Sequence, residues 1–369
     1  EQPYIVSVRF KLEELDARLA RDLAQVDVFR SGEDGYDTFR IPSVIVAPDG
    51  SVLAFAEGRK TGSGDSGNID LVMKRSFDHG DTWSDLQVVW DDADNTCGNP
   101  CPVVDATTGT IWMLMTHNLG SDREGAIVKG LSHGTRTVWI TRSTNNGVNW
   151  SEPVEITSQV KPDHWTWYAT GPGVGIQLRS GRLVVPCDNK EAETDRHQSH
   201  VIYSDDHGAT WNLGPAVGPD CNECQVAELS DGRLMLNMRS YRGAHRRLIS
   251  YSNDQGQSWS EPEEDVALVE PVCQASLIAY GTTDGSGGLL FSNPASTRRE
   301  NMTVRYSPDD GKTWTTARRL HSGPAAYSCL TILLNHAIGC LYERGEKSAY
   351  EKITFARFSL NWVKGKPSR

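Results

Sequence analysis

Three arginines stand in stretches that otherwise predict buried strands. Arg40 lies in TFRIPSV (38–44), Arg239 in LNMRSY (236–241) and Arg305 in MTVRYS (302–307). Thr, Phe, Ile and Val favour strands, and a charge among apolar residues needs an ion-pair partner or an anionic ligand. Neighbouring guanidinium groups repel one another unless an anion neutralises them, and their planar fork matches a carboxylate. If the fold brings the three arginines together, they predict a carboxylate-binding site; the alternative is three salt-bridged surface residues.

A short repeat indicates how the chain positions these residues. The pattern S-x-D-x-G-x-x-W occurs at 76–83, 204–211, 252–259 and 307–314, and STNNGVNW (143–150) is a fifth copy with Asn in place of Asp. In a hairpin turn, Asp or Asn accepts backbone N–H groups, Gly adopts a positive φ and Trp packs over the turn. Each copy follows a short predicted strand, so the repeats are expected to be structural.

The spacing of the copies predicts an all-β, six-bladed β-propeller. Successive copies begin 67, 61, 48 and 55 residues apart, which is enough for a four-stranded blade and a variable loop. At roughly 55–60 residues per blade, the chain has length for six blades, the last without a repeat. Blades pack radially on one another, so residues 27–369 are expected to form one domain in which inner strands of distant blades converge on an axis.

The N-terminal segment has a different periodicity. Leu12, Leu15, Leu19 and Leu23 recur at helical spacing within residues 10–26. We therefore expect residues 1–26 to be a short, helical N-terminal extension that takes no part in chemistry.

These features together resemble the exo-α-sialidases. The resemblance extends over nearly the whole chain. It rests on FRIP (39–42), on EGR (57–59), on the five copies of the repeat, which are called Asp boxes, and on an arginine on each of two later blades. In that family three arginines hold the C1 carboxylate of sialic acid. The resemblance assigns this role to Arg40, Arg239 and Arg305.

The resemblance also implies supporting residues around the sugar. Glu343 matches the acidic residue that orients the FRIP arginine, although it could instead be a surface glutamate beside Arg344. Arg59 resembles the residue that contacts the 4-hydroxyl, and Asn99 stands where many relatives have Asp. The aromatic stretch WTWYATGPG (165–173) is expected to line the pocket around the N-acetyl and glycerol arms.

A nucleophile and its base are implied in the same way. The reacting carbon of a sialoside bears a carboxylate, which repels an anionic nucleophile but not a neutral phenol. Tyr327 matches the family's nucleophile and Glu223 the base that removes its proton. Sixteen residues separate Glu223 from Arg239, and sixteen separate Tyr327 from Glu343, as in the family pattern.

The glycine-rich stretch KTGSGDSGNID (60–70) carries two candidates for the general acid. Asp65 matches the acid on the family's mobile loop, whereas Asp70 begins the next predicted strand. We favour Asp65, because an acid on a loop can follow the substrate and be desolvated on closure. Six residues separate Arg59 from Asp65, where some relatives have five.

Composition limits the partners. A net charge of −11 argues against nucleic acid, and no run of 18 apolar residues predicts a membrane span. The close pairs Cys97/Cys101 and Cys221/Cys224 lack a His at ligand spacing, so we expect buried thiols or a disulfide, no metal and no cofactor. A chain that begins at Glu1 without Met is compatible with processing, and we expect a secreted or periplasmic protein whose oligomeric state stays open.

The predicted function is a retaining exo-α-sialidase that releases terminal α-linked sialic acids from glycoproteins, glycolipids and oligosaccharides through a tyrosyl intermediate. A non-catalytic propeller that binds sialic acid could keep the arginines, but would not need Tyr327, Glu223 and Asp65 together. A trans-sialidase, or a hydrolase of a related nonulosonic acid such as Kdn, would use the same residues. The trans-sialidase, the hydrolase of a related nonulosonic acid and the linkage preference therefore stay open.

Overall fold

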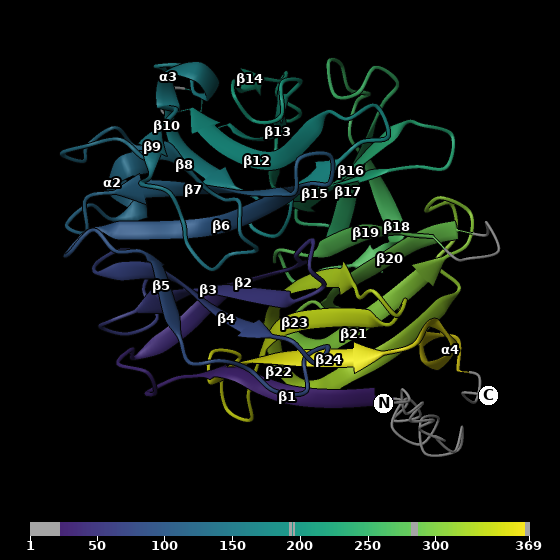
Figure 1. The fold of residues 1–369 in the computed structure, drawn as a ribbon. Helices are drawn as coiled ribbons and strands as arrows, with labels where there is room; N and C mark the ends of the chain where they lie inside the picture. The colour runs from purple at the N-terminus through teal and green to yellow at the C-terminus, as the bar shows by residue number, and fades with distance from the viewer. Residues whose placement is uncertain (1–22, 192–193, 195, 282–286, 366–369) are drawn as a thin grey trace, which may run out of the picture.

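Antiparallel strands make up most of the computed structural model, which describes residues 23–191, 194, 196–281 and 287–365 (Figure 1). Their hydrogen-bonded pairs group into six sets of four, each of which we take as one blade. The first set contains β2 (Thr38–Val46), β3 (Val52–Arg59), β4 (Ile69–Ser76) and β5 (Gln87–Trp90). The second contains β6 (Thr96–Asp105), β7 (Thr110–Asn118), β8 (Thr137–Ser143) and β9 (Val154–Glu155).

The third set has a divided first strand, because β10 (Trp165–Thr170) and β11 (Ile176–Gln177) both pair with β12 (Leu183–Glu191). It continues with β13 (His197–Ser204) and β14 (Asn212–Leu213). The fourth set contains β15 (Cys221–Glu228), β16 (Leu234–Ser240), β17 (Arg246–Ser252) and β18 (Glu263–Val269). In the described part of the chain, three short helices lie outside the sets: α2 (Glu124–Val128), α3 (Thr157–Val160) and α4 (Leu360–Val363).

The fifth and sixth sets share one long strand. The fifth contains β19 (Ser276–Gly281), β20 (Gly287–Pro294), β21 (Glu300–Ser307) and the first half of β22 (Thr316–Ile332). The second half of β22 then pairs with β23 (Ile338–Arg344), followed by β24 (Lys352–Phe358) and β1 (Leu23–Arg30). In order around the axis, β2 contacts β6, β6 contacts β10 and β11, β12 contacts β15, β15 contacts β19, β19 contacts β22, and β22 contacts β2 to complete the circle. The predicted all-β propeller architecture is confirmed.

The predicted N-terminal helix is wrong where the structure describes it. Residues 1–22 lie outside the described part, but Leu23–Val26 belong to β1, which pairs antiparallel with β24 (Figure 1). Leu23 packs against a hydrophobic cluster that includes Phe358. Burial and pairing with an open strand edge therefore override the helical spacing, and the propeller begins at Leu23 instead of residue 27.

The Asp boxes are turns between the third and fourth strands of their sets, as predicted. In the third set, the Gly208 N–H donates to Ser204 Oγ at 2.8 Å, and the Thr210 N–H donates to Asp206 Oδ1 at 2.9 Å. Gly208 has φ 89°, which favours glycine because a Cβ is disfavoured there. Hydrogen bonds from the Thr210 backbone and hydroxyl lower the pKa of Asp206.

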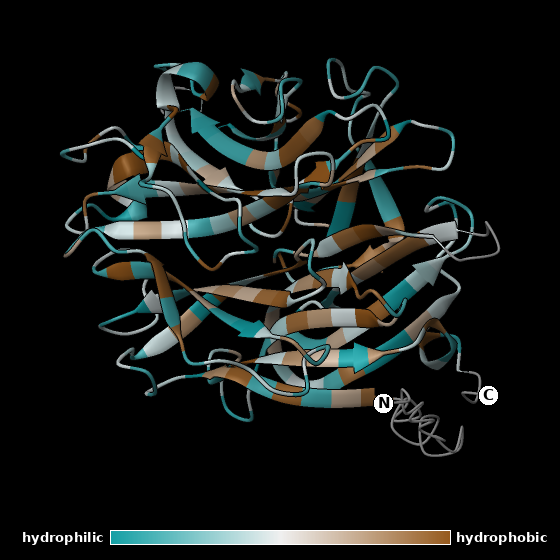
Figure 2. Ribbon diagram, in the orientation of Figure 1, coloured by the Kyte–Doolittle hydropathy of each residue, from teal (hydrophilic) through white to brown (hydrophobic). Residues whose placement is uncertain are grey.

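Apolar side chains pack between neighbouring blades. Phe55 of β3, Met113 of β7 and Phe355 of β24 belong to a single buried cluster, although they come from three different sets. Hydrophobic segments lie along the strands, and the connecting loops are largely hydrophilic (Figure 2). This packing holds the innermost strands, which carry four of the predicted site residues: Arg40, Asn99, Glu223 and Tyr327.

Candidate active site

A pocket of about 350 Å³ opens at one end of the innermost strands. Its volume is in the range of small-molecule binding sites, about 300–1,000 Å³. Seven of the nine predicted site residues line it: Arg40, Arg59, Asp65, Asn99, Glu223, Arg239 and Tyr327. None of the Asp-box residues does, which agrees with their structural role.

β-Bulges in the innermost strands place the lining side chains. Besides a shift at Trp165/Trp167 in β10, pairing shifts register in four places: Arg40/Ser43, Gly98/Cys101, Cys221/Cys224 and Ala325/Ser328. A bulge leaves a residue without a cross-strand partner and bends the strand, so it redirects side chains. Ile41 has φ 60°, which is rare for a β-branched residue and marks local strain within FRIP. Predicted site residues lie at or inside all four bulges.

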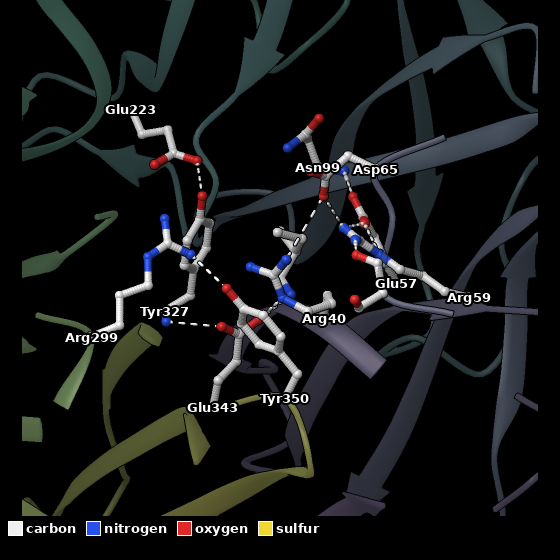
Figure 3. Close-up of polar contacts among 12 residues, drawn as sticks. Arg40, Glu57, Arg59, Asp65, Asn99, Glu223, Arg299, Tyr327, Glu343 and Tyr350 are labelled. Atoms are coloured by element: carbon white, nitrogen blue, oxygen red, sulfur yellow. Dashed lines mark hydrogen bonds and ion pairs between the residues drawn. The ribbon is translucent and has the colours of Figure 1, made fainter. Parts of the chain in front are cut away.

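Tyr327 and Glu223 are in direct contact (Figure 3). The Tyr327 hydroxyl donates to Glu223 Oε1 at 2.5 Å, and Arg239 Nη1 donates to Glu223 Oε2 at 2.7 Å. Burial, and then the charge of Glu223, raise the pKa of Tyr327 well above its usual value. The phenol is therefore neutral, and its proton already points at a carboxylate.

Glu343 fixes the orientation of the Arg40 side chain and lies outside the pocket lining. Arg40 Nε and the Ile41 N–H both donate to Glu343 Oε1, at 2.8 and 3.0 Å, and the Tyr327 N–H donates to Oε2 at 3.0 Å. Burial alone would lower the pKa of Arg40, but Glu343 raises it well above the ordinary value. Glu343 is fully buried, so the alternative of a surface glutamate is wrong.

Asp65 lies among arginines (Figure 3). Its Oδ1 is 2.7 Å from Arg59 Nη2 and 3.7 Å from Arg40 Nη1. Burial alone would raise the pKa of Asp65, but the charges of Arg59 and Arg40 outweigh it and hold that pKa below the usual range. Asp70, the other acid considered, lies outside the pocket lining and accepts from the Tyr36 hydroxyl at 2.6 Å.

The predicted place of Arg305 is wrong. It lies near the end of β21, two residues before the Asp box that begins at Ser307, whereas the pocket is at the opposite end of that strand. The half-buried Arg305 side chain has a pKa lowered by burial, which Asp265 only partly opposes. In the first five sets, the third strand runs from the pocket end to an Asp box, so an arginine beside a box does not reach the pocket.

Arg299, directly before β21, lines the pocket in its place. Its Nη1 donates to the Tyr350 hydroxyl at 2.8 Å, and its Cζ is 5.6 Å from the centre of the Tyr327 ring. The Tyr350 ring in turn lies 4.1 Å from Arg40 Cζ. Strand direction, read from the box at Ser307, was the signal that could have identified Arg299.

Sequence reasoning also missed buried residues in the wall of the pocket. Glu57 accepts from Arg59 Nη2 at 2.6 Å and from the Asn99 N–H at 2.8 Å. Arg136 donates to Asn99 Oδ1, and its Cζ lies 4.3 Å from the centre of the Trp167 ring. Trp167 lines the pocket, as the aromatic stretch predicted. Asn99 thus lies between a glutamate and an arginine.

All eight cysteines are free and buried, which excludes the disulfide alternative. Burial raises the pKa of Cys221 to about 12, so its thiol is largely un-ionised at neutral pH. In the described ranges, no group of three or more His, Cys, Asp or Glu residues is arranged to hold a metal ion. No described helix is long and apolar enough to cross a membrane.

Comparison with known proteins identifies the family. The family described as "BNR repeat-like domain" matches residues 50–342. A sialidase of Micromonospora viridifaciens is 36% identical over 363 residues, covering 92% of this chain and 54% of that protein. An exo-alpha-sialidase of Arthroderma benhamiae is 31% identical over 364 residues, covering 90% of this chain and 86% of the relative. The chain belongs to the sialidase family.

Solved structures agree with this sialidase assignment. "Hadza microbial sialidase Hz136" is 33% identical, with a TM-score of 0.84 over 92% of this chain and 69% of that one. An intramolecular trans-sialidase from Ruminococcus gnavus has a TM-score of 0.76 over 92% of this chain and 98% of that one, but at 20% identity it shows the fold alone. This sialidase-family chain spans 54% and 64% of the length of the first two relatives, from Micromonospora viridifaciens and Bacteroides fragilis.

Proposed function

We propose that this chain is a retaining exo-α-sialidase that hydrolyses terminal α-linked sialic acids on glycoproteins, glycolipids and oligosaccharides. The 2.5 Å contact between the Tyr327 hydroxyl and Glu223, inside a pocket lined by arginines, carries the proposal. Relatives named sialidases at 31–36% identity support it. Such glycans are exposed outside cells, so the same proposal makes the protein secreted or periplasmic.

Three arginines bind the substrate carboxylate in this proposal: Arg40, Arg239 and Arg299. Each lines the pocket, and together they ring the Tyr327 phenol: Arg239 Nη1 is 3.4 Å from its oxygen, and Arg40 Cζ lies 5.1 Å from its ring centre. A carboxylate accepts charge-assisted hydrogen bonds from guanidinium groups in a fixed geometry. Binding there presents the adjoining anomeric carbon to Tyr327.

The reaction then has two steps. Tyr327 Oη attacks the anomeric carbon while its proton passes to Glu223, and Asp65 protonates the departing glycosidic oxygen. Water next attacks the tyrosyl-linked carbon, giving a proton to Asp65, while Glu223 returns its proton to the Tyr327 oxygen as that bond breaks. Two displacements at one carbon retain its configuration, and both acids end in their starting states.

Substrate binding itself would prepare Asp65 to act as an acid. Without substrate, Asp65 is held ionised by Arg59 and Arg40. A substrate carboxylate takes over Arg40 and adds a negative charge beside Asp65. Both changes favour the protonated form, so the pKa of Asp65 rises when the sugar is bound.

A time course with 3′- and 6′-sialyllactose, with and without added lactose, tests this function. We expect free sialic acid from at least one isomer, released first as the α-anomer, with no transfer to lactose. Tyr327→Phe should abolish release, whereas Tyr251→Phe, on β17 and away from the pocket lining, serves as a matched control and should not. Binding without release would favour the lectin, and sialyl transfer to lactose the trans-sialidase; Kdn glycosides tested in parallel report the related sugar.

A further inference from the structure

Asp188 on β12 is a fully buried carboxyl group in the wall of the pocket. Its Oδ1 accepts a hydrogen bond from Asn222 Nδ2 at 2.9 Å. Its Oδ2 is buried and has no hydrogen-bond partner. No described lysine, arginine or histidine forms an ion pair with it. None of the reaction steps above uses this group.

An isolated carboxylate in such a place is strongly disfavoured. A buried charge without a cation at ion-pair distance costs several kcal/mol, and the group takes up a proton instead. Burial, and then the charge of Glu223, raise the pKa of Asp188 well above its usual value. The orphan Oδ2 is easier to accommodate on a neutral acid than on a carboxylate.

The groups around Asp188 do not provide a dedicated partner. The charged side chains that act on it come from four different segments: Glu124, Arg136, Glu223 and Arg239. Arg239 is already bonded to Glu223, and Arg136 donates to amide and hydroxyl oxygens. The remaining titratable neighbours have raised pKa values and are neutral: Tyr168, Cys187, Cys224 and Tyr241.

The contact that Asp188 does make leads to the base. Asn222 directly precedes Glu223 inside the β15 bulge. Its side-chain amide lies between two partners, since Nδ2 donates to Asp188 and Oδ1 accepts from the Tyr241 hydroxyl at 3.4 Å. Tyr241 in turn has its ring centre 5.2 Å from Arg239 Cζ. Asp188 thus begins a chain of contacts that runs through Asn222 and Tyr241 to Arg239, the partner of Glu223.

We propose that Asp188 is a positioning residue that acts as an uncharged acid, fixing Asn222 beside Glu223 and leaving Glu223 as the only charged partner of Arg239. This inference rests on the sialidase function proposed above. A second carboxylate here would compete with Glu223 for Arg239 and would repel the anionic substrate. The neutral acid provides the hydrogen-bond acceptor that Asn222 needs without adding that charge.

Two variants separate the neutral from the ionised form. Asp188→Asn keeps an uncharged acceptor for Asn222, whereas Asp188→Ala removes it. Losing one hydrogen bond corresponds to about a 3- to 10-fold effect, so kcat/KM should fall about tenfold in Asp188→Ala and less in Asp188→Asn. At alkaline pH the KM of the wild type should rise as Asp188 ionises, and this rise should be smaller in Asp188→Asn.

Infrared difference spectroscopy detects directly whether the Asp188 carboxyl group is protonated. Without substrate at neutral pH, the spectrum of wild type minus Asp188→Asn should contain the C=O stretching band of a protonated carboxyl group. Asp231→Asn is the matched control: Asp231 is exposed, and hydrogen bonds from the Arg233 backbone and side chain lower its pKa, so its difference spectrum should contain a carboxylate band and no band of a protonated carboxyl group.

An active wild type without the protonated band would overturn the inference. So would an Asp188→Asn variant as impaired as Asp188→Ala, because the negative charge would then be the required feature. Failure of the proposed function has a different signature, namely a wild type that releases no sialic acid from any substrate.

Discussion

Replacing Arg299 or Arg305 by lysine tests the arginine assignment most directly. Arg299→Lys keeps the charge in the pocket but removes the planar fork and the 2.8 Å bond to the Tyr350 hydroxyl. A hydrogen bond between charged groups contributes about 1.5–3 kcal/mol, and about 1.4 kcal/mol is a factor of ten. We therefore expect kcat/KM to fall about 10- to 100-fold.

Arg305→Lys provides the matched comparison, on the strand that directly follows Arg299. Arg305 lies at the Asp-box end of β21 and does not line the pocket, so kcat/KM should stay within about twofold of the wild type. Both variants should be assayed on sialyllactose at one pH, with urea unfolding to confirm that each is folded. A larger kinetic loss in Arg305→Lys than in Arg299→Lys would refute the assignment of the third arginine.

Three further predictions concern the chemistry and the turns. A 3-fluorosialosyl fluoride should label a peptide containing Tyr327, slowly in Glu223→Gln; label elsewhere would exclude the tyrosyl mechanism. Asp65 must be protonated to act and its pKa rises on binding, so the fall of kcat with pH should lie at higher pH than that of kcat/KM, and both falls should vanish in Asp65→Asn. Ser204→Ala leaves the buried Gly208 N–H without an acceptor and should lower the free energy of urea unfolding by about 1–3 kcal/mol, with kinetics unchanged.

Local sequence patterns predicted the Asp-box turns, and most of the site residues that they predicted line the pocket. The Asp boxes specify their turns through contacts within a few residues, so sequence alone predicted their geometry. FRIP and the spacing from Tyr327 to Glu343 likewise placed residues that the structure brings together. Arg305 was placed in the pocket because only the composition of its strand was considered. The Asp box that begins at Ser307 marks the end of β21 that lies away from the pocket.

Other features depend on packing between segments distant in sequence. Nothing in the residues around Asp188 or Arg136 indicates that they lie against one pocket, because their neighbours come from other blades. The leucine spacing near the N-terminus was a genuine helical pattern, but Leu23–Val26 pair with β24. Long-range pairing is invisible to local periodicity.

The pairing of β1 with β24 has a consequence for how the chain folds during synthesis (Figure 1). The Thr354 hydroxyl donates to Asp27 Oδ1 at 2.6 Å, across 327 residues of sequence. The ribosome therefore makes β1 long before its partner exists, and the ring cannot close until β24 has emerged. Contacts of such sequence separation form slowly, and an unpaired edge can meanwhile pair with another chain. Aggregation of truncated or slowly translated chains should therefore begin at the edge of β1 that β24 covers in the complete fold.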